Sequence, residues 1–340
     1  MTSEVHRPPR RAPQPAPRSA PPVRNGLVPP AGTPGTALTL ALALAVTLAV
    51  TLALAGCGTG RAADGTGTGP IAVVAAEDVW GGVAAQLGGR HVSVTSIISG
   101  PDVDPHDYEP RARDARAVAS AAYVIVNGAG YDAWASKLLA AGGSQPAVLD
   151  VGRLVGVRDG ANPHRWYSPP DVAEVVARIT SDYKRLDPGD AASFDRLRSS
   201  FESTGLARYT SLVEDIRRTY RGTAIGASES IVAPLAGALG LDLVTPESFL
   251  DAVSEGTEPT ARDKATADAQ IASGRIKAYV FNRQNSTPDV RAQVRAAKAA
   301  GIPVVSVTET PPAMSSFQDW QANQLEGLRA ALATATGAGA

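Results

Sequence analysis

The sequence predicts a protein of the α/β class, with two parallel-sheet lobes joined by a single long helix. Three observations lead to this prediction. Short apolar runs such as 71–76 and 276–281 have the length and composition of strands buried on both faces. Helical patterns alternate with such runs in two blocks of the chain, which is typical of parallel sheets covered by helices. A long helical pattern over 191–220 separates the two blocks.

The first block predicts an N-terminal lobe over 70–188. Asp78 is placed to cap its first helix, whose apolar residues recur on one face. The expected strands are 71–76, 92–98, 123–127 and 147–149, and the expected helices are 78–87, 111–121, 131–141 and 171–186.

The second block repeats this style and predicts a C-terminal lobe over 221–332. Its expected strands are 223–227, 241–244, 276–281 and 303–307. Its expected helices are 231–239, 247–253, 260–273, 288–300 and 315–332. Residues 333–340 are expected to form a disordered tail.

The segment 189–220 is predicted to be the linker helix. A break at 187–190 comes before the helical pattern, which begins at 191. Its apolar residues then recur at spacings of three and four, as in Phe194, Leu197, Phe201, Leu212, Val213 and Ile216. Gly205 weakens the middle of this helix by about 1 kcal/mol relative to alanine. A helix of this length between two strand-helix blocks is best explained as a connector.

Residues 1–56 have the pattern of a signal peptide. A long n-region over 1–36, rich in proline and arginine, precedes an apolar run over 37–55. The sequence Leu-Ala-Gly-Cys at 54–57 resembles the lipobox of bacterial lipoproteins, which implies lipidation of Cys57 and an extracytoplasmic protein anchored to the cell membrane. A plain transmembrane helix is the alternative, because the run is long enough to cross a bilayer. The position of the chain's only cysteine favours the lipobox, with a flexible tether over 57–69.

The composition excludes some partners. Removal of residues 1–56, which carry five arginines and one glutamate, lowers the formal charge from −1 to −5. A mildly acidic domain argues against binding to nucleic acid, which needs a basic patch. With Cys57 as the only cysteine, the chain forms no internal disulfide.

Two loops contain a proline followed by a histidine. His106 lies in the acidic stretch 102–110, after an expected strand, and His164 lies in the stretch 162–167. Prolines fix local dihedrals, so each loop is stiff enough to hold an imidazole in place, as a metal site or a catalytic base requires. A polar surface turn is an equally reasonable interpretation of the first stretch.

Four residues lie near the carboxyl ends of expected strands: His106, His164, Glu229 and Glu309. Ligands bind at this edge of open α/β sheets, and two residues come from each lobe, so the four would line an interlobe cleft. Two imidazoles and two carboxylates suit a divalent cation such as zinc or manganese. Each residue alone also fits a structural role, as a loop histidine or as a glutamate at a helix N-terminus.

The mature chain from 71 to 328 resembles the family of zinc- and manganese-binding solute-binding lipoproteins that serve ABC importers. The motifs that carry the resemblance are DPHDYEP at 104–110, VIVNG at 124–128 with Trp134, NPHRW at 162–166, the long linker helix, ASES at 227–230 and TET at 308–310. The family fold has two Rossmann-like α/β lobes with parallel sheets, joined by one helix with limited hinge motion.

The resemblance implies that His106, His164, Glu229 and Glu309 bind the metal. The fourth family position is usually aspartate, so Glu309 is one methylene longer than the family pattern. It also implies capture of Zn2+ or Mn2+ as transported ligand by a monomer, with delivery to an ABC permease and its ATPase. Four protein ligands leave no open position for an activated water, so we expect no enzymatic activity. Residues expected to orient the ligands are Asp78, Asn127, Trp166 and Asn282.

Two other functions remain open from the sequence. A metallohydrolase would need an open ligand position and a separate base, and the chain has no HExxH motif. A surface adhesin of the same fold would show itself as a surface patch.

Overall fold

The computed structural model describes residues 69–100 and 108–337. These residues fall within one compact unit, Gly65–Ala340. The expected signal peptide, Cys57 with most of the tether, and His106 lie outside the described residues. Within the two described ranges, no helix is both long and apolar enough to cross a membrane.

The sheet of the N-terminal lobe has four parallel strands in the order β2-β1-β3-β4. Its central strands β1 and β3 are buried because helices cover both faces. The strands are β1 Ile71–Glu77, β2 Val92–Ile98, β3 Tyr123–Val126 and β4 Ala147–Asp150. The helices are α2 Asp78–Gly88, η1 Gly89–His91, α3 Ala112–Ser120, α4 Ala133–Ala141, α5 Val151–Leu154, η2 Arg165–Tyr167 and α6 Pro169–Leu186.

The C-terminal lobe has the same sheet topology, with the order β6-β5-β7-β8. The strands are β5 Ala224–Ala227, β6 Asp242–Leu243, β7 Ala278–Asn282 and β8 Val304–Val307. The helices are η5 Ser230–Val232, α9 Ala233–Leu239, α10 Glu247–Ser254, α11 Ala261–Ala272, α12 Pro288–Ala299 and α13 Phe317–Thr336. The two parallel-sheet lobes expected from the sequence are therefore confirmed.

Helix α13 runs to Thr336, four residues past the end expected at Leu332. Alanine-rich sequence favours its continuation, and Gly337 ends the helix in a left-handed conformation with φ 68°. The expectation of a disordered tail over 333–340 is therefore wrong for 333–336, which are helical, while 338–340 lie outside the described residues.

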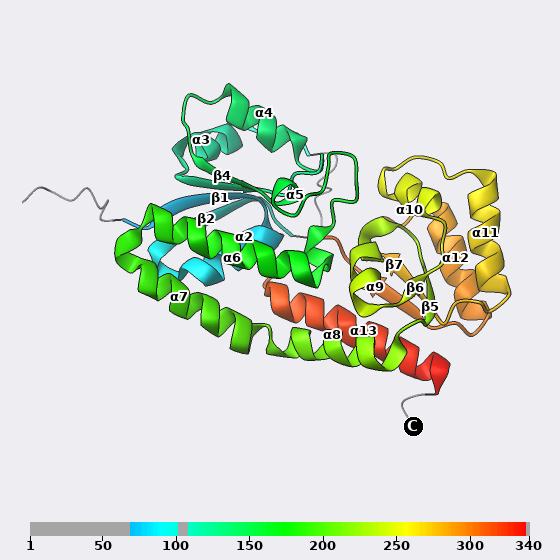
Figure 1. Cartoon of the computed structure of the whole chain (residues 1–340). Coiled ribbons are helices and arrows are strands. Elements are labelled where there is room, and N and C mark those ends of the chain that lie inside the picture. Colours follow the sequence, from blue (N-terminus) through cyan, green and yellow to red (C-terminus); the bar gives the residue numbers. More distant parts are fainter. Residues whose placement is uncertain (1–68, 101–107, 338–340) are drawn as a thin grey trace, which may run out of the picture. The chain divides into compact units, whose positions relative to one another are not determined.

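The connector is a helix with an internal irregularity. The η3 turn Pro188–Asp190 leads into α7 Ala191–Ser200, and a π-helical segment over Phe201–Gly205 separates α7 from α8 Ala207–Tyr220. The irregularity occurs where Gly205 was expected to weaken the helix. Helix α13 lies beside α8 (Figure 1), and Arg208 pairs with Glu326 at 2.7 Å between the two helices.

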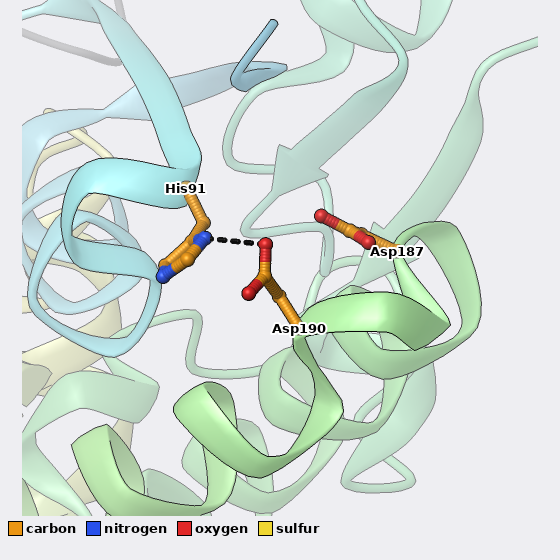
Figure 2. Close-up of side chains that lie close together, drawn as sticks. All are labelled: His91, Asp187 and Asp190. Atoms are coloured by element: carbon orange, nitrogen blue, oxygen red, sulfur yellow. Dashed lines mark ion pairs between the residues drawn. The ribbon is translucent and has the colours of Figure 1, made fainter. Parts of the chain in front are cut away.

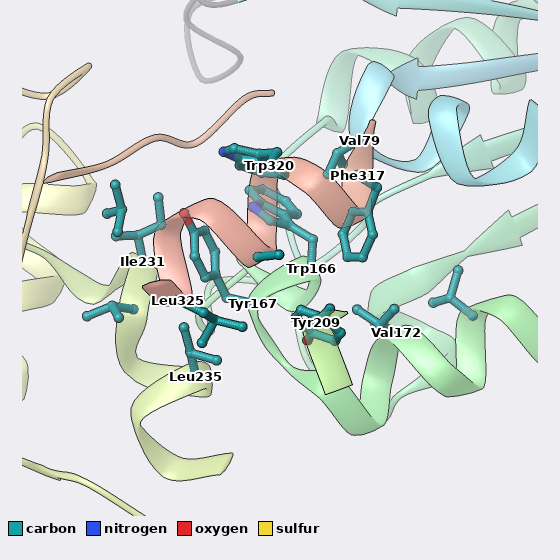
Figure 3. Packing of buried hydrophobic residues seen from close by; sticks show 14 of the residues in the cluster. Val79, Trp166, Tyr167, Val172, Tyr209, Ile231, Leu235, Phe317, Trp320 and Leu325 are labelled. Carbon is teal, nitrogen blue, oxygen red and sulfur yellow. The ribbon is translucent and has the colours of Figure 1, made fainter. Parts of the chain in front are cut away.

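One hydrophobic core extends through both lobes. It joins Trp80 and Trp166 of the N-terminal lobe to Ile231 and Leu325 of the C-terminal lobe. Figure 3 shows Trp166, Tyr167, Trp320 and Leu325 packed together where the lobes meet. Large aromatic side chains dominate the free energy of burial, so wide separation of the lobes would expose these rings at a high cost. The packing therefore favours small movements between the lobes.

Both sheets change their winding direction at the same point. Each lobe adds its second strand on one side of the first, and its third strand on the other side. In open α/β sheets a ligand crevice forms at this switch point, outside the carboxyl ends of the two central strands. These are the ends of β1 and β3 in one lobe, and of β5 and β7 in the other.

Candidate metal centre

His164 is the described candidate ligand of the N-terminal lobe, and 1% of its surface is exposed. Its Nδ1 lies 2.9 Å from Asn162 Oδ1, while the amide nitrogen of Asn162 donates to Ser230 O at 2.7 Å. Because the amide nitrogen faces that carbonyl, the amide oxygen faces the imidazole and Nδ1 carries the proton. In the neutral imidazole, the lone pair that a metal ion would bind then lies on Nε2. The Trp166 ring packs edge-on at 5.4 Å.

Asn127, at the end of β3, holds the loop that carries His164. Its Nδ2 donates to Pro163 O at 2.9 Å, and its Oδ1 accepts a hydrogen bond from Trp80 Nε1 at 2.9 Å. Both contacts are buried or nearly so, which makes them costly to leave unmade. The residue acts on the histidine through the backbone of the preceding proline.

A tight turn after β3 presents Tyr131 to the other lobe. Gly128, Ala129 and Gly130 have φ values of 71°, 55° and 87°, a left-handed run that is strained for the alanine. Asp132 secures the turn by accepting hydrogen bonds from Asn127 N at 2.6 Å and Gly128 N at 2.9 Å. Burial raises the pKa of Asp132 to about 6. The stored strain is consistent with a functional role for Tyr131.

Glu229 follows β5 and is 2% exposed. Its two oxygens accept hydrogen bonds from Asn282 Nδ2 at 2.7 Å and from Asn285 Nδ2 at 2.6 Å. Burial raises the pKa of this carboxyl; the nearby His164 and the two amides oppose the shift, and Glu309 adds to it. Each oxygen retains a second lone pair that can bind a cation.

Glu309 follows β8, in a segment that both lobes hold. Its Oε1 accepts a hydrogen bond from Tyr131 OH at 2.8 Å and lies 3.5 Å from His164 Nε2. Its backbone nitrogen donates to Gln284 Oε1 at 2.6 Å. The preceding Thr308 accepts a hydrogen bond from Tyr167 OH at 2.8 Å through its carbonyl oxygen. The carboxylate is therefore directed at the imidazole from the opposite lobe.

The structure thus brings three of the four predicted ligands to the junction of the lobes. His164 and Glu309 are nearest, and Glu229 interacts electrostatically with both. His106 lies outside the described residues. An imidazole nitrogen and two carboxylates are donor types that suit zinc, manganese or a similar divalent cation.

The residues expected to orient the metal ligands differ in what they contact. Asn282 hydrogen-bonds a candidate ligand directly, Asn127 acts through the backbone, and Trp166 packs on the imidazole. Asp78 accepts a hydrogen bond from Gly100 N at 2.9 Å, which ties the start of α2 to the segment after β2. That contact serves the backbone rather than His164.

Sequence reasoning missed Tyr131, Asn162 and Asn285, all of which contact candidate ligands. Asn162 lies two residues before His164, and Asn285 lies three residues after Asn282, so their proximity in sequence was an available signal. Tyr131 had no such signal, because its partner Glu309 comes from the other lobe.

Within the described residues, the ligand atoms of one group of three such side chains all lie within 4.8 Å of one another: His91, Asp187 and Asp190 (Figure 2). His91 Nδ1 lies 2.7 Å from Asp190 Oδ2, which is a hydrogen-bonding distance. Ligand atoms held about 2.0–2.2 Å from a zinc ion lie farther apart than this in a tetrahedral site. The His91 ring also packs against Phe194 of α7, with centroids 5.5 Å apart. This ion pair therefore fastens the start of the connector.

The candidate centre adjoins a cavity of about 550 Å³ at the junction of the lobes. Both lobes line it, through residues that include Tyr131, Asn162, His164, Ser230, Leu250 and Asp251. The cavity gives solvent a route to the imidazole side of the centre.

These features define a two-lobed binding protein whose candidate site is built for a metal ion. A family model described as "Zinc-uptake complex component A periplasmic" matches residues 73–331. The chain belongs to this family, ZnuA, of metal-binding solute-binding proteins. The resemblance seen in the sequence is thereby confirmed.

Individual relatives agree with the family. The manganese-binding lipoprotein MntA of Halalkalibacterium halodurans is 32% identical over 145 residues, covering 40% of this chain and 47% of the relative. The chain thus matches about half the length of that curated relative. A manganese-bound mutant of the periplasmic metal-binding protein from Candidatus Liberibacter asiaticus has a TM-score of 0.66 at 17% identity, covering 76% of this chain and 98% of that one. A mutant of the laminin-binding adhesin Lmb from Streptococcus agalactiae has a TM-score of 0.61 at 20% identity, covering 77% and 99%. These two similarities show the fold alone.

Proposed function

We propose that this protein captures a divalent transition-metal ion, zinc or manganese, between its lobes and delivers it to the permease of an ABC importer. His164, Glu229 and Glu309 are the ligands in this proposal, with His106 as the fourth. Capture rather than chemistry is the role assigned to the site. The family of transport components supports this assignment.

The observation that carries the proposal is the contact between His164 and Glu309. Nε2 of the imidazole lies 3.5 Å from Oε1 of the carboxylate, and the other imidazole nitrogen is already bound to Asn162. An imidazole nitrogen beside a carboxylate from the other lobe is a pair of donors that one metal ion could bind together. An ion bound there would join the two lobes.

For the purified protein we expect tighter binding of zinc than of manganese. The Irving–Williams order favours zinc over manganese at a given site of nitrogen and oxygen ligands. Two carboxylates that can bind through both oxygens favour manganese by raising the coordination number. The order of affinities does not determine the ion carried in the cell, which also depends on the available concentrations.

A competition titration of zinc against manganese at neutral pH tests the proposal. Replacement of His164 by alanine should abolish the rise in melting temperature that metal produces, because a ligand that binds only the folded state stabilises it. His91→Ala is the matched control, since its imidazole lies in the ion pair of Figure 2. Equal metal-induced shifts in both variants would contradict the proposal.

We further propose that lipidated Cys57 anchors the protein outside the cytoplasm, where the permease with its ATPase receives the metal. Named lipoproteins among the relatives support this location. Cys57→Ala should release the protein from membranes or leave it unprocessed. Membrane fractionation measures this, and a mature-sized variant that remains with the membranes would contradict the anchor.

A further inference from the structure

The shared topology of the two sheets identifies corresponding positions at their switch points. In the N-terminal lobe Ala75 lies opposite Ile125, so two residues further along, Glu77 lies opposite Asn127. In the C-terminal lobe Ala227 lies opposite Val280, so the same step places Glu229 opposite Asn282. Each lobe therefore has a glutamate and an asparagine side by side at its switch point, where ligands bind.

The two glutamates differ in their partners. Glu229 has an amide on each oxygen, whereas Glu77 is 2% exposed and neither of its oxygens has a hydrogen-bond partner within the described ranges. Asn127, the counterpart of Asn282, is already bonded to Trp80 and Pro163. A buried carboxyl without partners destabilises the folded protein unless it is neutralised or meets a cation.

The direction of Glu77 follows from the alternation of side chains along β1. Ala75 and Val73, two and four residues before Glu77, contact the core that contains Tyr131 and Trp166, whereas Val74 contacts the core on the opposite face. Glu77 continues the first set and therefore points to the face of the sheet that carries His164.

The electrostatics agree with this direction. Burial raises the pKa of Glu77 well above its ordinary value, and the charges of Asp132, Asp78 and Glu309 add to the shift. Glu77 in turn helps to raise the pKa of Tyr131, after the larger effects of burial and Glu309. Glu77 therefore lies close enough to interact with the pair formed by Tyr131 and Glu309.

We propose that Glu77 is a further oxygen donor to the captured metal ion, contributed by the N-terminal lobe as the counterpart of Glu229. The inference rests on the proposed function. A third carboxylate raises the number of oxygen donors, which suits manganese better than zinc with its four tetrahedral ligands. Glu77 would then reduce the factor by which the site binds zinc more tightly than manganese.

Two substitutions of Glu77 test this role. Glu77→Gln removes the charge and keeps the shape, and Glu77→Leu removes the donor. The leucine variant is expected to weaken manganese binding by at least about tenfold and zinc binding by less than about threefold, since a tetrahedral zinc site needs fewer donors. X-ray absorption of the manganese-loaded leucine variant should show one oxygen donor fewer than that of the manganese-loaded wild type. The metal-free variants should melt at a higher temperature than the wild type, because an unpartnered buried carboxyl has been removed.

Asp182→Asn is the matched control. Asp182 is also 2% exposed, but it accepts hydrogen bonds from Tyr123 OH at 2.8 Å and Arg178 Nε at 2.9 Å. Its substitution should lower the melting temperature of the metal-free protein and leave both metal affinities unchanged.

The outcomes separate the inference from the proposed function. A wild-type protein that binds neither metal would contradict the proposed function itself. If the wild type binds metal and both Glu77 variants keep the wild-type ratio of manganese to zinc affinity, Glu77 is not a donor. A lower melting temperature with an equal loss of both affinities would also overturn the inference, in favour of a purely structural role.

Discussion

Glu229 and the pair formed by His164 and Glu309 are held in different ways. In the C-terminal lobe, Glu229 is held by Asn282 and Asn285, both from the same lobe. At the lobe junction, His164 and Glu309 depend on contacts that cross between the lobes. Asn162 links the histidine loop to the backbone of the C-terminal lobe, and a tyrosine of the N-terminal lobe donates to Glu309.

One candidate ligand is therefore oriented by contacts within its own lobe, and the other two are oriented by contacts between the lobes. Glu229 has its orientation as soon as its own lobe folds, because both partners are near β7. His164 and Glu309 reach their 3.5 Å separation only when the lobes are in contact. We therefore expect substitutions around Glu229 to act on metal affinity and on the stability of its own lobe, and substitutions at the junction to act also on the coupling between the lobes.

The largest effect is expected at Glu309. Glu309→Gln should weaken zinc and manganese by more than about 100-fold, which exceeds the usual loss from a supporting residue. The amide oxygen can still accept from Tyr131, so the fold should be retained. Glu309→Asp shortens the side chain by one methylene and should instead change the ratio of the two affinities. Competition titration measures both, and two unchanged affinities would mean that the fourth ligand lies elsewhere.

Removal of both amides from Glu229 is expected to have the next largest effect. The variant with Asn282→Ala and Asn285→Ala leaves a buried carboxylate without its hydrogen bonds, so metal affinity should fall by about 10- to 100-fold. The metal-free protein should also lose about 1–3 kcal/mol of unfolding free energy for each unsatisfied group. Calorimetric titration and denaturant unfolding measure these losses. Normal affinity in the double variant would show that Glu229 needs no support from its lobe.

Much of the fold could be predicted because it depends on local patterns. The four strands of each lobe were visible as apolar runs separated by helical periodicity. The π-helical segment at 201–205 could not be located from periodicity, although Gly205 indicated a weak point. The end of α13 was placed too early because alanine and threonine after 332 carry no strong periodic signal.

The candidate ligands that lie just past strand ends could be predicted from the sequence. The positions of Glu229 and Glu309 follow from the rule that ligands gather at the carboxyl edge of parallel sheets. Contacts between the lobes, such as Tyr131 with Glu309, link residues 178 positions apart and leave no trace in a single sequence. Glu77 was overlooked because the expected strand ended one residue before it.

Tyr131→Phe tests the junction with a smaller expected effect. The substitution removes one hydrogen bond to Glu309 and keeps the ring that packs against Trp166. Both metal affinities should fall by about tenfold, within the range for a group that orients a ligand. Tyr183→Phe is the matched control, because Tyr183 is buried in the same lobe and donates to Ala84 O. A similar loss of affinity in both variants would mean that the effect is not specific to the junction.

The smallest effect concerns pH and again contrasts Glu229 with the junction. Burial raises the folded-state pKa of Glu229 above its ordinary value of 4.5. Between 4.5 and that raised pKa, the folded metal-free protein holds a proton that the unfolded chain has released. This contribution to stability is therefore present at low pH and is lost as pH rises through the folded-state pKa. Metal must displace the same proton, so affinity should rise with pH over that window and then level off.

Asn285→Ala isolates the contribution of Glu229 to this pH dependence. The hydrogen bond from Asn285 lowers the pKa of Glu229, so its removal should shift the rise in metal affinity to higher pH. Tyr131→Phe should leave the position of that rise unchanged, because Tyr131 donates to Glu309 instead. Titrations from pH 5 to 8 in buffers of different ionisation enthalpy would report both the affinity and the protons released. If both variants move the curve equally, the two carboxylates titrate as one coupled group, and the distinction between the lobe-held and junction-held ligands fails.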